Sequence, residues 1–211
     1  MGAVGPDIPH DEAFEPYALE IGFLVREWNE LQRQLSMLFN IFLEAAETHY
    51  ADDDREQYQY WIVSDAIWHA VPNDRFQRKM LEELVIHRLP ANSVLLADVR
   101  WLIERANGTG RQRDDAVHSP VMAFLPDLNT LTFEADFVFG HPLAMKLKDK
   151  NLLLELKYYR ERCTLLHRYS FSLWSHLRKF PEPDWRYDSK IGPLPEKPAL
   201  PAAPPKRKDA E

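Results

Sequence analysis

The sequence has few of the residues on which several protein classes depend. Its 211 residues include one cysteine, Cys163, and only seven glycines. A single cysteine forms no disulfide within the chain, which fits a reducing compartment, and scarce glycine disfavours an all-β fold rich in tight turns. No apolar run approaches the length of a membrane span, and residues 1–12 lack the basic and then apolar pattern of a signal peptide. We therefore expect a soluble, cytoplasmic protein with no membrane partner.

An excess of positive charge is also absent. The chain has 26 Lys and Arg against 33 Asp and Glu, which gives a formal net charge of −7. Such a field repels polyanions, so a protein that coats nucleic acid is disfavoured. A small, locally basic cleft remains compatible with this charge, because screening over roughly 8–10 Å makes the nearest charges dominate.

Apolar and aromatic residues are plentiful, at 45% and 12% of the chain. This content supports one sizeable core and a single domain with tails. We expect a flexible N-terminus over residues 1–13, a helical domain over 14–180 and a disordered tail over 181–211. The tail is placed there because residues 181–211 hold eight of the 16 prolines.

Two segments carry apolar residues at alternating spacings of four and three, which predicts two long helices. One begins at Phe14, and the other runs from Leu152 to Leu177. The apolar stripe of the segment that begins at Phe14 consists of Tyr17, Ile21, Leu24, Trp28, Leu31, Leu35, Leu38, Phe42 and Ala45.

Shorter helices are predicted between the two long ones from their start and stop signals. A helix follows the acidic run 52–54 and ends at Pro72, and a second is capped by Asn73 or Asp74 and ends before Pro90. A third begins at Asn92 or Ser93 and is closed by the NGTG stretch at 107–110. Alternation in 121–125 and 131–139 around PDLN predicts a short β-hairpin. The fold class is therefore an all-α bundle of about five helices, two of them long, with a β-hairpin insertion.

The polar stretch GRQRDDAVHSP at 110–120 places Arg113 ahead of His118 with four residues between them. This pattern, in a helical protein, resembles the signature of the HEPN superfamily, in which an arginine, commonly followed by a polar residue, precedes a histidine with four to six residues between them. The segment SDAIWHAVPNDRFQRKMLEEL is also similar to segments of bacterial members. The resemblance covers residues 15–125 in the order of elements. Asp114 stands where the family often has asparagine, and its carboxylate can pair with Arg113.

The resemblance implies a homodimeric helical protein that cleaves RNA without a metal or other cofactor, as a toxin or in antiphage defence. A neutral imidazole takes a proton from a 2′-hydroxyl near neutral pH, which is the role expected for His118. Arg113 would hold the phosphate and stabilise its developing charge. Asp114 and Asp115 would orient these two residues, and Arg111 would attract the RNA backbone. An antitoxin or another protein partner is expected for a toxin.

Two alternatives share the same helical fold. The first is a non-catalytic dimerisation or interaction module whose working surface is the stripe of a long helix, and the second is a nucleotide-binding sensor that uses the Arg113 and His118 pocket. Arg162 and His167 repeat the spacing inside the second long helix. We interpret that second pair as structural.

Overall fold

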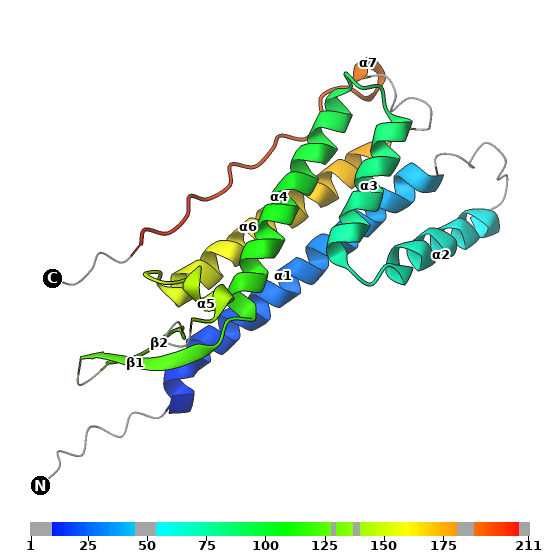
Figure 1. Cartoon of the computed structure of the whole chain (residues 1–211). Coiled ribbons are helices and arrows are strands. Elements are labelled where there is room, and N and C mark those ends of the chain that lie inside the picture. The colour runs from blue at the N-terminus through cyan, green and yellow to red at the C-terminus, as the bar shows by residue number, and fades with distance from the viewer. Residues whose placement is uncertain (1–9, 45–53, 128–129, 137–139, 181–187, 207–211) are drawn as a thin grey trace, which may run out of the picture. The chain divides into compact units, whose positions relative to one another are not determined.

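The computed structural model describes residues 10–44, 54–127, 130–136, 140–180 and 188–206 (Figure 1). Its helices are α1 (His10–Glu44), α2 (Asp54–Ala70), α3 (Asp74–Arg88), α4 (Val94–Val117), α5 (Pro142–Met145), α6 (Leu152–Leu177) and α7 (Asp188–Ile191). Strands β1 (Val121–Asp127) and β2 (Thr130–Ala135) pair in antiparallel fashion, with Val121 opposite Ala135. The predicted all-α bundle with five longer helices and a short hairpin is confirmed.

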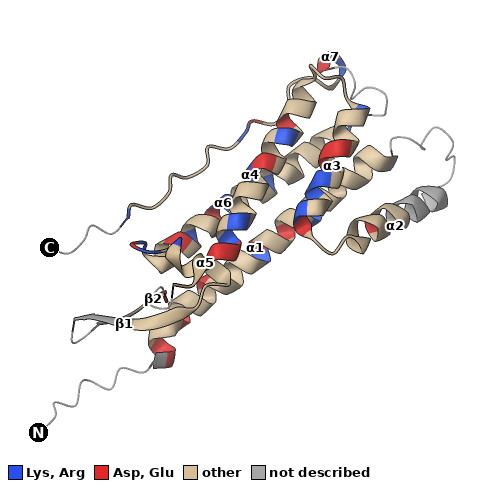
Figure 2. Ribbon diagram, viewed as in Figure 1, with Lys and Arg blue, Asp and Glu red and all other residues tan. Residues whose placement is uncertain are grey.

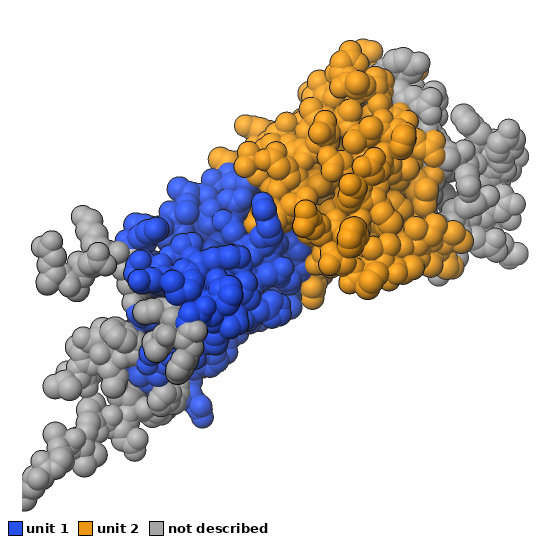
Figure 3. All heavy atoms as spheres, in the orientation of Figure 1, with its two compact units in different colours: residues 1–28, 109–163, 200–211 blue, residues 29–108, 164–199 orange. Residues whose placement is uncertain are grey.

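The chain divides into two compact units (Figure 3). Unit 1 comprises Met1–Trp28, Thr109–Cys163 and Leu200–Glu211, and unit 2 comprises Asn29–Gly108 and Thr164–Ala199. Helices α1, α4 and α6 each supply residues to both units. The single domain expected over 14–180 stays a prediction.

In unit 1 the hairpin packs on the start of α1 through aromatic side chains. The ring of Phe133 on β2 meets the Tyr17 ring edge-on at 5.4 Å and the Phe14 ring at 4.9 Å. The Tyr17 hydroxyl also accepts a hydrogen bond of 3.2 Å from the backbone N–H of Phe133. Phe133 of the predicted strand thus faces the long helix, as one side of an alternating strand does.

The core of unit 2 consists of the apolar stripes of α1, α3, α4 and α6. Its fully buried members include Leu31, Leu35, Leu38, Phe42, Leu81, Val85, Leu95, Val99, Leu102, Leu166, Leu173 and Leu177. The α1 and α6 members are the residues that the four-three spacing selected. The periodicity therefore predicted the buried face of each long helix.

Two predicted helix starts are confirmed by their hydrogen bonds. Asn73 caps α3, because its side chain accepts from the Arg75 N–H at 2.8 Å. At α4 the Ser93 hydroxyl accepts from the Leu96 N–H at 3.4 Å. Each bond satisfies a backbone donor that has no partner within its helix.

The helix predicted to begin at Asn92 or Ser93 does not end at the NGTG stretch 107–110. That predicted end was wrong, since α4 continues through these residues to Val117. Three residues of the stretch, Asn107, Thr109 and Gly110, have packing roles instead of turn roles. Asn107 accepts a hydrogen bond from the Arg78 Nε at 2.8 Å, and the fully buried Thr109 accepts one from the Arg162 Nε at 3.2 Å. A Cβ at Gly110 would lie 2.6 Å from Cη2 of Trp28, so only glycine fits there.

The ends of the chain also depart from the predicted boundaries. Helix α1 begins at His10, four residues before the predicted start. Part of the tail expected to be disordered has defined contacts, because α7 buries Ile191 and the Asp188 carboxylate accepts from the Val94 N–H at 3.0 Å. Gly192 leaves α7 at φ +67°, a conformation that favours glycine.

Within the described residues, no helix combines the length and apolar character that crossing a membrane requires.

Candidate functional site

Arg113 lies in the last turns of α4 and points into unit 1. Its guanidinium carbon is 4.9 Å from the centre of the Trp28 ring, and its side chain is only 17% exposed. Its Nε donates to Oδ1 of Asp114 at 3.0 Å, and its Nη2 also pairs with that oxygen. The predicted pairing of Asp114 with Arg113 is thus present, and the guanidinium is held between a ring and a carboxylate.

The surroundings of Arg113 are those of a core-facing residue. It follows Gly110 by three positions and precedes Ala116 by three, and both of these neighbours are buried. Burial raises the pKa of the Cys163 thiol to about 12, while the charge of Arg113 acts to lower it and that of Glu27 acts to raise it. Arg113 is therefore close enough to α1 and α6 to affect their interior groups.

His118 follows the last residue of α4 and is exposed. Its backbone N–H still donates to the Asp114 carbonyl at 3.1 Å, so the helical geometry reaches this residue. Five helical positions correspond to a rotation of about 140° between Arg113 and His118. His118 instead shares a helix face with Arg111 and Asp114, both of which are exposed. The structure therefore does not place Arg113 and His118 on one helix face.

The remaining predicted site residue, Asp115, is engaged elsewhere. Lys146, which follows α5, has its Nζ 2.6 Å from Oδ1 of Asp115, and the Asp115 side chain is 17% exposed. This ion pair joins the end of α4 to the α5 segment within unit 1. Asp115 thus supports the local fold, and the carboxylate nearest His118 on its own face is that of Asp114.

The second pair with this spacing has an arginine that is held in a similar way. Arg162 on α6 donates from Nη1 to the Tyr158 hydroxyl at 2.9 Å, and its guanidinium lies over the Tyr158 ring at 5.4 Å. Both arginines are thus half-buried and stacked on aromatic rings. This contact set agrees with the structural interpretation of Arg162.

Unit 2 contains a cavity of about 700 Å³ between α1, α2 and α3 that the sequence did not indicate. Its polar lining includes Ser36, Asn40, Asp65 and His69. The Ser36 hydroxyl donates to Oδ1 of Asp65 at 3.2 Å, and Nε2 of His69 lies 3.5 Å from the same oxygen. The carboxylate stands between the hydroxyl and the imidazole, so His69 is not placed to take the Ser36 proton, as a serine nucleophile would require.

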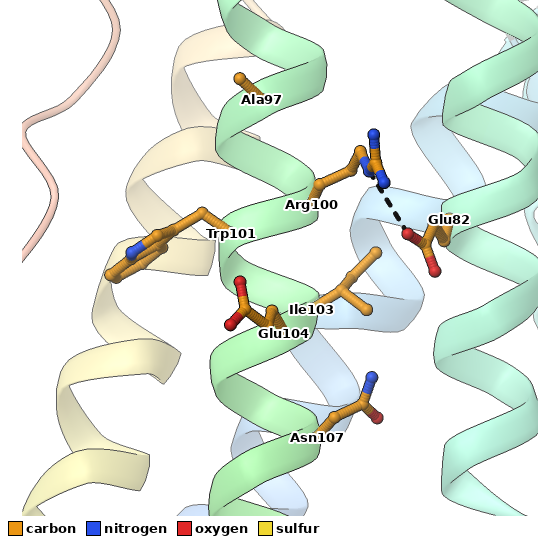
Figure 4. A pocket seen from close by; sticks show the side chains of 7 residues that line it. All are labelled: Glu82, Ala97, Arg100, Trp101, Ile103, Glu104 and Asn107. Carbon is orange, nitrogen blue, oxygen red and sulfur yellow. Dashed lines mark ion pairs between the residues drawn. The ribbon is translucent and has the colours of Figure 1, made fainter.

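A second cavity, of about 570 Å³, lies on α4 beside α3 (Figure 4). Arg100 forms an ion pair with Glu82 at 3.4 Å across the two helices. Trp101 and Glu104 line the same cavity from adjacent turns of α4. Glu104 makes no hydrogen bond or ion pair with any residue that the structure describes. The cavity thus offers an aromatic ring and a carboxylate to an incoming group.

In the described parts of the chain, no three His, Cys, Asp or Glu side chains come together as a metal site would require. Comparison with family models, with curated proteins and with solved structures finds no match to this chain. The proposals below therefore depend on the geometry of its own residues.

Proposed function

We propose that this chain is a non-catalytic helical module that forms a homodimer through α2. The observation that carries the proposal is an exposed apolar stripe on that helix. Val63 is 55% exposed and Ile67 43% exposed, and Ala66 and Ala70 are exposed beside them. These four residues follow the spacing i, i+3, i+4, i+7, which is one face of a helix.

The other face of α2 already has its partners within unit 2. Trp68 is 1% exposed and its ring lies 5.3 Å from that of Phe39 on α1, while Ser64 is also buried. Over residues 62–70, whose side chains the structure describes, α2 therefore has a packed inner face and an exposed outer face. An uncovered apolar face of this kind is typical of a binding surface.

A second copy of the chain is the partner that fits this stripe best. Residues 62–70 of α2 include the acidic Asp65 and no Lys or Arg, as the ribbon colours of Figure 2 indicate, and the stripe itself carries no charge that would select an ionic partner. The small Ala66 and Ala70 allow close approach, and Val63 and Ile67 of one copy can fill the space over the alanines of the other. A two-fold axis makes one patch complementary to itself in this way.

Ile67→Glu tests the dimer by placing a charge on the stripe. Sedimentation velocity over a range of concentrations should give a dimer for the native chain and a monomer for Ile67→Glu. Leu154→Glu is the matched control, because Leu154 is 44% exposed on α6, far from α2 in sequence, and it should leave the dimer intact. A native chain that stays monomeric, or an Ile67→Glu variant that dimerises as the native chain does, contradicts the proposal.

Metal-independent cleavage of RNA at His118 is the second candidate function, with Arg111 in place of the predicted Arg113 as the phosphate-binding arginine, because Arg113 stacks on Trp28 on another face of α4. The exposure of His118 and its position on one helix face with Arg111 favour it, together with the resemblance to the HEPN superfamily. An exposed imidazole is accessible to a 2′-hydroxyl, and Arg111 offers a cation on the same side for the phosphate. An antitoxin would belong to this function alone.

Incubation of the purified chain with RNA in EDTA decides between the two candidates. The ribonuclease hypothesis expects cleavage that His118→Ala abolishes and Arg111→Ala strongly reduces. The non-catalytic module expects no cleavage, or a trace that the native chain and His118→Ala share equally. His141→Ala, which removes another exposed histidine, controls for the loss of an imidazole.

A further inference from the structure

Residues 192–199 extend along α4 after α7 (Figure 1). They read GPLPEKPA, and three of the eight are prolines. The segment is anchored at its start, because Ile191 is 1% exposed and its carbonyl oxygen lies 2.9 Å from Nε2 of His176. Because proline has no backbone N–H, this segment has fewer backbone donors with which to bind the helices beside it, and its attachment depends more on side chains.

Lys197 provides that attachment through Asp98. Its Nζ lies 2.5 Å from Oδ1 of Asp98, whose side chain is only 6% exposed. The Tyr169 hydroxyl donates to the other oxygen, Oδ2, at 2.6 Å. Burial and the Asp98 carboxylate raise the pKa of Tyr169, so the hydroxyl remains a donor. Both oxygens of the buried carboxylate are thus satisfied, one by a tyrosine and one by the ammonium group.

Trp101 completes the surroundings of the ammonium group. Its ring meets that of Tyr169 edge-on at 5.4 Å, and Nζ of Lys197 is 5.8 Å from the Trp101 ring centre. A carboxylate and an aromatic face together form a preorganised acceptor for a primary ammonium group. The half-buried Leu194, Pro195 and Pro198 show that residues on both sides of Lys197 also rest against neighbouring groups.

We infer that Asp98, Trp101 and Tyr169 form a recognition site for a lysine flanked by prolines, which Lys197 occupies in cis and which a proline-rich, lysine-containing segment of another protein can occupy in trans. The segment 192–199 then acts as a built-in competitor. A tethered ligand has an effective concentration on the order of millimolar, so the identical segment of a second copy cannot compete at micromolar concentrations. The partner is therefore a different polypeptide with additional contacts.

The cavity beside Trp101 shows where such additional contacts are available. Glu104 lies one turn along α4 from Trp101 and has no ion-pair partner among the described residues (Figure 4). A second basic side chain in the incoming segment can pair with Glu104, which Lys197 does not do. This second contact distinguishes a segment in trans from the segment in cis.

Binding of a labelled GPLPEKPA peptide to the full-length chain tests the site by fluorescence anisotropy. The native chain should bind it weakly, since Lys197 competes, and Lys197→Ala should bind it at least about tenfold more tightly because the tethered competitor is lost. Lys179→Ala is the matched control, because it removes an exposed lysine of the same unit and should bind as the native chain does.

Four further measurements identify the contacts in the Lys197→Ala background. Replacing the peptide lysine by norleucine should abolish binding, and adding a second lysine to the peptide should strengthen it in a way that Glu104→Gln reverses. Asp98→Asn should abolish binding, and Tyr169→Phe, which keeps the carboxylate and most of the packing, should weaken it several-fold. Equal affinity of the native chain and Lys197→Ala, or binding that ignores the peptide lysine, would overturn the inference.

Discussion

Gly108 and Gly110 stand two residues apart in α4, yet their surroundings differ. A Cβ at Gly110 would lie 2.6 Å from Cη2 and 3.2 Å from Cζ2 of Trp28, whereas a Cβ at Gly108 would meet nothing within 4 Å. Alanine is the better helix former by about 1 kcal/mol. At Gly110 the collision with a buried ring outweighs this gain, since overpacking costs about 1–3 kcal/mol.

Urea unfolding of the two alanine variants tests this difference. Gly110→Ala should lower the free energy of unfolding by up to about 2 kcal/mol, the net of overpacking and helix propensity. Gly108→Ala should raise it by about 0.5–1 kcal/mol. If both substitutions shift the midpoint in the same direction, Trp28 does not fill the space beside Gly110 as described.

Some contacts of the Arg113 side chain could be predicted from the sequence and others could not. Its type, its polar neighbours and its distance from His118 could all be read from the sequence, and so could the chance of pairing with Asp114. The stacking on Trp28 could not, because Trp28 is 85 positions earlier in the chain and joins Arg113 only through tertiary packing. Sequence spacing predicts which face a residue occupies only if the helix boundary is correct.

At the scale of elements, the main error was the predicted C-terminal end of α4 at residues 107–110. Apolar periodicity predicted α6 from Leu152 to Leu177 and the hairpin near PDLN, because these patterns are local. The glycines at 108 and 110 resemble a helix stop, but their surroundings in three dimensions decide otherwise. With α4 ended early, Arg113 fell in an apparent bend, and its inward orientation could not be foreseen.

The C-terminal segment was also difficult to predict, because its contacts are with residues distant in the sequence. Proline-rich composition is typical of disorder, and that is what the sequence favoured for residues 181–211. Ile191, Asp188 and Lys197 nevertheless attach the segment through one buried side chain and two carboxylate contacts. Composition averages over a segment, whereas two of these attachments depend on single residues, Asp188 and Lys197, whose partners Val94 and Asp98 lie about 90–100 positions away.

At the scale of the whole molecule, Cys163 reports on the opening of the fold. It is the one cysteine in the chain, it is completely buried, and burial raises its thiol pKa to about 12. A thiol with that pKa is ionised in roughly one molecule in ten thousand at pH 8, whereas an unperturbed thiol with a pKa near 8.5 is ionised in roughly a quarter. Since the thiolate is the reactive form, the native chain is protected in two ways. Burial keeps the reagent away from the thiol, and the raised pKa keeps the thiol protonated.

Labelling of Cys163 by a thiol reagent at pH 8 should therefore proceed through opening of the structure. In the native chain the reaction should be at least about a thousandfold slower than in 6 M urea. Because Gly110→Ala strains the packing of Trp28 in the same unit, it should accelerate labelling, whereas Gly108→Ala should not. Labelling of the native chain at the rate of the unfolded chain would mean that the thiol is accessible in the folded molecule, and the packing of unit 1 would then need revision.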